Sequence, residues 1–179
     1  MVRFLTSCIL ALAAAASTAL ADRLPDDIYH VIYFPGIPSI PHFLTLDTPQ
    51  GDATFNPTRL TDERAGRQLW RVTTNELSPT WRGLQSVGWA VLLGYPSSAP
   101  GTRVRGAQGD DITYYDISDS ASPPGGCLNY FVRPYADDSV TLNSDGFPVP
   151  STRPAFFRPI GQGPFAATPL CFEKVDTDA

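Results

Sequence analysis

The chain has 179 residues, of which 42% are hydrophobic and only 17% charged, and it contains 18 prolines and 14 glycines. Acidic residues outnumber basic ones by 18 to 13, which disfavours sequence-independent nucleic-acid binding because that binding needs a basic surface. The prolines are spread throughout and disfavour a helical bundle, since proline breaks helix interiors. The length fits one domain with its own core.

The first 21 residues are typical of a secretory signal. Arg3 supplies a positive charge, an apolar stretch runs from Phe4 to Ala16, and an Ala-x-Ala end closes at Ala21. The apolar stretch is too short for a membrane anchor, and no later run approaches the length of a membrane helix. We therefore expect a secreted, extracellular mature chain that starts at Asp22, forms one domain over 22–179 and contacts no membrane.

After the signal, short runs rich in β-branched and aromatic residues alternate with clusters of turn residues. The pattern predicts twelve strands, at 28–34, 42–46, 55–60, 68–73, 82–87, 89–93, 102–105, 112–117, 128–132, 140–142, 155–158 and 170–175. A brief helical turn is expected within 62–66, and no long helix.

The predicted strands fall into three groups of four, which indicates repeated units over about 26–78, 79–122 and 123–175. Aligned on the fourth strand of each unit, the middle position carries Trp70, Tyr115 and Leu170, which we expect to be structural. One such unit cannot bury its apolar face alone, so the three must share a core. A closed six-stranded barrel capped by three hairpins achieves this and removes most sheet edges.

Export changes how the cysteines are interpreted. Cys8 leaves with the signal, and Cys127 and Cys171 remain. An even number of cysteines in an oxidising compartment favours a disulfide, which would close a span of 44 residues. The alternative is a pair of buried free thiols.

These features resemble the β-trefoil proteins. Gln68-Leu69-Trp70 matches the Gln-x-Trp signature of ricin-type trefoils. The layout is also similar to mushroom trefoil protease inhibitors, the clitocypin-like inhibitors and related serine protease inhibitors, through Asp27-Ile28-Tyr29, residues 69–73 and the 94–102 hairpin. The resemblance implies an all-β, β-trefoil fold, a fungal source, and first and fourth strands that lie side by side, which brings Cys127 near Cys171. Clitocypin-like proteins usually lack a secretory signal, so the signal here is a departure.

Catalysis is not expected. Only two histidines, His30 and His42, are present, and neither belongs to a zinc-binding pattern. No nucleophile elbow occurs, and the acidic pairs Asp110-Asp111 and Asp137-Asp138 lie in hydrophilic loops, where solvated turn residues are common. We therefore expect a binding protein without a cofactor or metal ion.

Protease inhibition is the leading hypothesis for function. It needs a rigid exposed loop that enters a protease cleft, and proline lowers the entropy cost of such a loop. Three loops of unit one qualify. Their candidate residues are Pro35, Gly36, Ile37 and Pro38 for a papain-like cleft, Arg64 for a trypsin-like pocket or as part of a second loop against a papain-like enzyme, and Asn56 in a loop that the resemblance to serine protease inhibitors implies. Each loop could instead be an ordinary trefoil connection.

Sugar binding is the alternative. Ricin-type lectins carry an Asp early in a unit together with the Gln-x-Trp motif, which implies Asp47 supported by Gln68 in unit one. A secreted effector that binds a host protein is a further possibility. The aromatic residues Trp81, Trp89, Tyr95 and Tyr135 either mark a binding face or fill the barrel. In each case the expected partner is a protease or a glycan, and the protein is expected to be a monomer that binds no nucleic acid.

Overall fold

The computed structural model describes residues 24–35, 40–76, 78–119, 127–135, 137–144, 151–161 and 167–176. The predicted signal at 1–21 lies outside these residues. The described chain is almost entirely β-structure, with one short 3₁₀ helix, η1 (Ala65–Gln68). Within it, no helix is long and apolar enough to cross a membrane.

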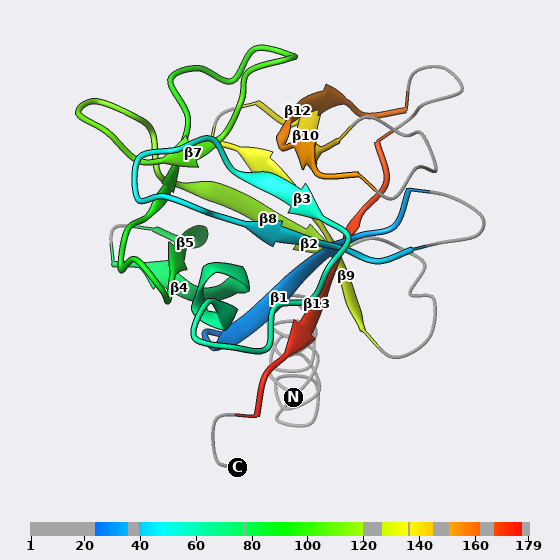
Figure 1. The fold of residues 1–179 in the computed structure, drawn as a ribbon. Helices are drawn as coiled ribbons and strands as arrows, with labels where there is room; N and C mark the ends of the chain where they lie inside the picture. The colour runs from blue at the N-terminus through cyan, green and yellow to red at the C-terminus, as the bar shows by residue number, and fades with distance from the viewer. Residues whose placement is uncertain are drawn as a thin grey trace, which may run out of the picture.

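Six strands form a closed antiparallel barrel (Figure 1). They are β1 (Ile28–Tyr33), β4 (Leu69–Asn75), β5 (Ser78–Ser86), β8 (Tyr115–Asp119), β9 (Leu128–Pro134) and β13 (Leu170–Lys174). The barrel closes because β1 pairs with β13 on one side and with β4 on the other. Figure 1 shows the first and last strands, in blue and red, side by side. Closure leaves no unpaired barrel edge.

Three short hairpins complete the fold. They are β2 (His42–Thr45) with β3 (Thr54–Asn56), β6 (Leu93–Gly94) with β7 (Arg105–Gly106), and β10 (Val140–Asn143) with β12 (Phe156–Pro159). A further two-residue strand, β11 (Arg153–Pro154), pairs with β3. The expected β-trefoil, a six-stranded barrel with a hairpin cap, is confirmed.

The cap carries a ring of three backbone hydrogen bonds. Ala53 N–H donates to Val104 O (2.9 Å), Val104 N–H to Ala155 O (3.1 Å), and Ala155 N–H to Ala53 O (3.0 Å). The three residues are fully buried and 51 residues apart along the chain. The ring therefore ties the three hairpins together around an approximate threefold axis.

The core lies inside the barrel and under the cap. Trp70, Tyr115 and Leu170 are all fully buried there. The Trp70 indole N–H donates to Leu44 O at 2.9 Å, so its one polar group is satisfied. Burial of the apolar area of these side chains is the main source of stability in a core of this kind.

Unit two departs from the strand prediction. Residues 89–93 are predicted as a strand, but Val87–Trp89 form a turn in which Ala90 N–H donates to Ser86 O at 2.8 Å and Ala90 has a φ of 56°. The regular strands of this hairpin start at Leu93 and Arg105 and are two residues long. The helical turn also lies later than predicted, so Gln68 ends η1 rather than beginning a strand.

Cys127 and Cys171 form a disulfide. Cys127 precedes β9 and Cys171 lies in β13, and their Cα atoms are 5.6 Å apart. The strands are paired, with Cys171 opposite Asn129. The bridge packs against Ile32 and Phe43 in a small apolar cluster outside the main core. The predicted disulfide is therefore present, and the free-thiol alternative is wrong.

Candidate functional site

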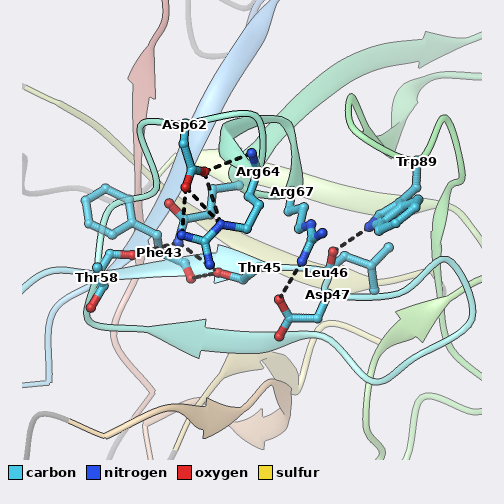
Figure 2. Close-up of polar contacts among 10 residues, drawn as sticks. Phe43, Thr45, Leu46, Asp47, Thr58, Asp62, Arg64, Arg67 and Trp89 are labelled. Carbon is cyan, nitrogen blue, oxygen red and sulfur yellow. Dashed lines mark hydrogen bonds and ion pairs between the residues drawn. The ribbon is translucent and has the colours of Figure 1, made fainter.

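A charged and aromatic surface lies where β2 and η1 meet the turn after β5 (Figure 2). Asp47 follows β2, Arg67 lies in η1, and Trp89 lies in the turn. Arg67 Nη1 is 3.9 Å from Asp47 Oδ1, and its guanidinium carbon is 5.4 Å from the centre of the Trp89 ring. We call these three residues the Asp47 face.

The polar groups of this face remain available to a ligand. The Asp47 side chain is 58% exposed and the Arg67 side chain 33% exposed. Among the described residues, the Asp47 carboxylate makes the long ion pair with Arg67 and accepts no hydrogen bond. An ion pair at this separation and exposure contributes little to stability. The face therefore offers an acceptor and a donor beside an aromatic ring.

Two glycines fix the backbone beneath the face. Gly88 N–H donates to Gly66 O at 2.8 Å. A Cβ on Gly88 would lie 2.8 Å from the Gly66 carbonyl carbon and 3.0 Å from Arg67 N, so this contact requires glycine. The Trp89 indole N–H donates to Leu46 O at 2.7 Å, which anchors the ring to the residue beside Asp47.

Gln68 is a structural residue and not a surface one. Its side-chain amide is fully buried; Nε2 donates to Thr45 Oγ1 (3.1 Å) and Thr58 O (2.8 Å), while Oε1 accepts from Leu60 N–H (2.7 Å). These bonds use three of the four hydrogen-bonding positions of a primary amide. Gln68 thus holds the 57–60 segment against β2, and its contact is with Thr45 rather than Asp47.

His30 lies on the other side of Gln68. Its Nδ1 pairs with the Gln68 carbonyl oxygen at 3.2 Å, and its ring packs edge-on against Phe43. Burial first, and the positive charge of Arg59 second, lower the pKa of His30. The buried imidazole therefore stays neutral at pH values where an exposed histidine begins to charge.

This shift predicts a pH-dependent stability. As the pH falls below about 6.5, the ordinary pKa of histidine, the unfolded chain takes up a proton that folded His30 resists, so the free energy of unfolding decreases. The His30→Gln variant lacks this proton uptake. The free energy of unfolding of the wild type should therefore fall relative to that of the variant as the pH is lowered from about 7.5 to 5.5. Urea denaturation across this range measures it, and parallel curves would contradict the assignment.

The candidate inhibitory residues lie elsewhere. Pro35 is buried just after β1, and Gly36, Ile37 and Pro38 lie outside the described residues. Asn56 Oδ1 accepts from Thr58 N–H at 2.9 Å and so shapes the turn after β3.

Arg64 folds back onto Asp62 (Figure 2). Its Nε donates to both carboxylate oxygens, at 3.1 and 3.0 Å, and its Nη2 donates to Oδ2 at 2.7 Å. This contact lowers the pKa of Asp62 to about 2. An extended Arg64, as a trypsin-like pocket requires, would have to give up this bidentate pair.

The sequence did not indicate that Arg67 and Trp89 join Asp47. The only local signals are Gly66 and Gly88, each directly before one of these residues, and their contact joins segments 22 residues apart. Among the described residues, no group of three or more His, Cys, Asp and Glu side chains could hold a metal ion.

No protein-family model matches the sequence, and no curated protein does. Solved structures match at a TM-score of 0.63 over 86% of this chain. The Rhizoctonia solani agglutinin is 15% identical with 98% of its chain covered, and the Macrolepiota procera ricin B-like lectin, in complex with lactose, is 13% identical with 99% covered. A mosquitocidal holotoxin is 15% identical, and this chain spans 18% of its length.

These neighbours place the chain in the class of β-trefoil folds that ricin B-like lectins and toxins share. At such low identity the match concerns the fold alone. The particular likeness to mushroom protease inhibitors stays a prediction, as do the fungal source and the export of the chain.

Proposed function

We propose that this chain is a secreted, non-catalytic carbohydrate-binding protein that holds a sugar at the Asp47 face. The observation that carries the proposal is the arrangement of Asp47, Arg67 and Trp89 on a backbone fixed by the Gly66–Gly88 contact. A carboxylate and a guanidinium supply an acceptor and donors for sugar hydroxyls. The Trp89 ring packs against the core with the Arg67 guanidinium over it, and so holds that guanidinium in place.

The neighbours support this choice over protease inhibition. One is an agglutinin and another is a lectin in complex with lactose, and both match this chain over nearly their whole length. The inhibitory hypothesis has weaker support, because Arg64 is paired with Asp62. The fold is compatible with either function, so the choice between sugar binding and protease inhibition rests on the residues of the site.

The test begins with a glycan array probed with the mature wild-type protein. For each glycan bound, Asp47→Ala should weaken binding by about tenfold or more, because a hydrogen bond to a charged group contributes about 1.5–3 kcal/mol. Asp110→Ala is the matched control, since Asp110 is an exposed aspartate in the loop after β7. Equal binding by both variants would reject the Asp47 face.

A further inference from the structure

A second surface is formed by Trp81 of β5, by Tyr114 directly before β8 and by Tyr135 directly after β9. The Trp81 and Tyr114 rings are stacked with centroids 5.9 Å apart, and the Tyr135 ring packs edge-on against Trp81 at 4.4 Å. Tyr114 is 37% exposed and Tyr135 is 41% exposed. We call these three residues the aromatic ridge. Large aromatic side chains gathered at the surface mark a binding site more often than scattered ones do.

The ridge is held in place from inside. The hydroxyl of the fully buried Tyr95 donates to Tyr114 O at 2.7 Å and accepts from Tyr135 N–H at 2.6 Å. Tyr95 is itself fixed, because its backbone exchanges two hydrogen bonds with Ile112. One buried side chain therefore sets the backbone positions of both exposed tyrosines. Ordering that backbone on ligand binding would then cost little conformational entropy.

Two open hollows lie near the ridge. One, of about 380 Å³, is lined by Asp116, Arg133, Pro134, Asp137 and Asp138. Its Asp116 pairs with Trp81 across the β5–β8 register and with Arg133 across β8–β9. One carboxylate oxygen of Asp137 is already engaged, since Oδ1 accepts hydrogen bonds from the backbone N–H and the hydroxyl of Ser139.

The second hollow, of about 330 Å³, lies beside Tyr114. Its lining includes Thr73, Asn75, Glu76, Gly83 and Tyr114. Gly83 deepens it, because a Cβ there would lie 3.1 Å from Thr73 Oγ1 and 3.3 Å from Leu92 Cδ2. The strand order β9-β8-β5-β4 therefore places the first hollow by β8 and β9 and the second by β4 and β5, and together their linings supply hydroxyl, amide and carboxylate groups.

We propose that the aromatic ridge and its two hollows bind an uncharged oligosaccharide, as a second site separate from the Asp47 face. The rings present apolar area to sugar C–H groups, and the flanking polar groups bond to the hydroxyls. The lining holds four carboxylates (Asp116, Asp137, Asp138 and Glu76) against one guanidinium (Arg133). This imbalance repels uronic and sialic acids. The choice of a sugar as the occupant rests on the proposed function.

The test uses the mature protein and an array of cello-, chito-, xylo- and manno-oligosaccharides, with uronic-acid oligosaccharides and an Arg-rich peptide on the same surface. The double variant Tyr114→Ala/Tyr135→Ala should lose binding to the uncharged oligosaccharides by about tenfold or more. Tyr114→Phe/Tyr135→Phe keeps the rings and should keep most of the binding.

Phe34→Ala is the matched control. Phe34 directly follows β1 as Tyr135 directly follows β9, and it is 39% exposed. Circular dichroism and thermal unfolding identify any variant that fails to fold. If the alanine double variant proves unfolded, the triple variant Trp81→Leu/Tyr114→Phe/Tyr135→Phe is used instead.

The outcomes separate this site from the Asp47 face. If the tyrosine-to-alanine variant loses oligosaccharide binding and Asp47→Ala keeps it, the ridge alone is supported. If each variant loses binding to different glycans, both sites are supported. Unchanged binding in the folded tyrosine variant overturns the ridge proposal and leaves the Asp47 face standing. Binding only to the Arg-rich peptide, or to none of the uncharged oligosaccharides, also overturns the ridge proposal.

Discussion

Replacing Gln68 with leucine is expected to lower the free energy of unfolding by about 3 kcal/mol. Leucine is similar in size but makes none of the three hydrogen bonds, so Leu60 N–H and Thr58 O lose their side-chain partner in two part-buried contacts. Each unpaired group of this kind costs about 1–3 kcal/mol. Urea denaturation followed by tryptophan fluorescence measures the change.

Gln85→Leu is the matched control for this substitution. Gln85 makes a single, exposed hydrogen bond from Nε2 to Ala90 O at 3.2 Å, so its loss should cost at most about 1 kcal/mol. The same experiment distinguishes a structural glutamine from one that contacts ligand. If Gln68→Leu kept its stability and lost only glycan binding, Gln68 would have to contact the sugar, contrary to its burial.

Removal of the disulfide has the other large expected effect. The Cys127→Ser/Cys171→Ala variant should be about 4 kcal/mol less stable, because the bridge closes a 44-residue span and so restricts the unfolded chain. Alanine suits position 171, where the side chain is buried. Equilibrium denaturation without reductant gives the difference.

The wild-type protein measured in reductant is the control for the cysteine variant. Reduction should produce a similar loss of stability in the wild type and none in the variant. A difference below about 1 kcal/mol between the oxidised wild type and the variant would mean that the bridge adds little beyond the β9–β13 pairing.

The barrel could be predicted from the sequence because its strands are at least five residues long and some of them alternate buried and less buried positions. Leu69–Asn75 and Leu128–Pro134 show this alternation, and the structure places both in the barrel. The hairpin of unit two could not be placed in the same way. Its regular strands, Leu93–Gly94 and Arg105–Gly106, have two residues each, which is too short for a periodic pattern.

The candidate site was harder to predict for a different reason. Asp47 is recognisable from the trefoil resemblance, but its neighbours come from η1 and from the turn after β5. Their approach depends on the backbone contact between Gly66 and Gly88, which no local pattern encodes. The sequence suggested that Gln68 supports Asp47, but its hydrogen bonds hold the 57–60 segment against β2.

An NMR titration of the ¹⁵N-labelled protein with an array-positive glycan tests most directly whether a sugar binds at the Asp47 face. The Trp89 indole N–H gives a side-chain signal of its own, and its bond to Leu46 O places it beside Asp47. We expect this signal and the Asp47 and Arg67 amides to shift in proportion to occupancy. Saturating glycan that leaves all three signals unmoved would contradict the account.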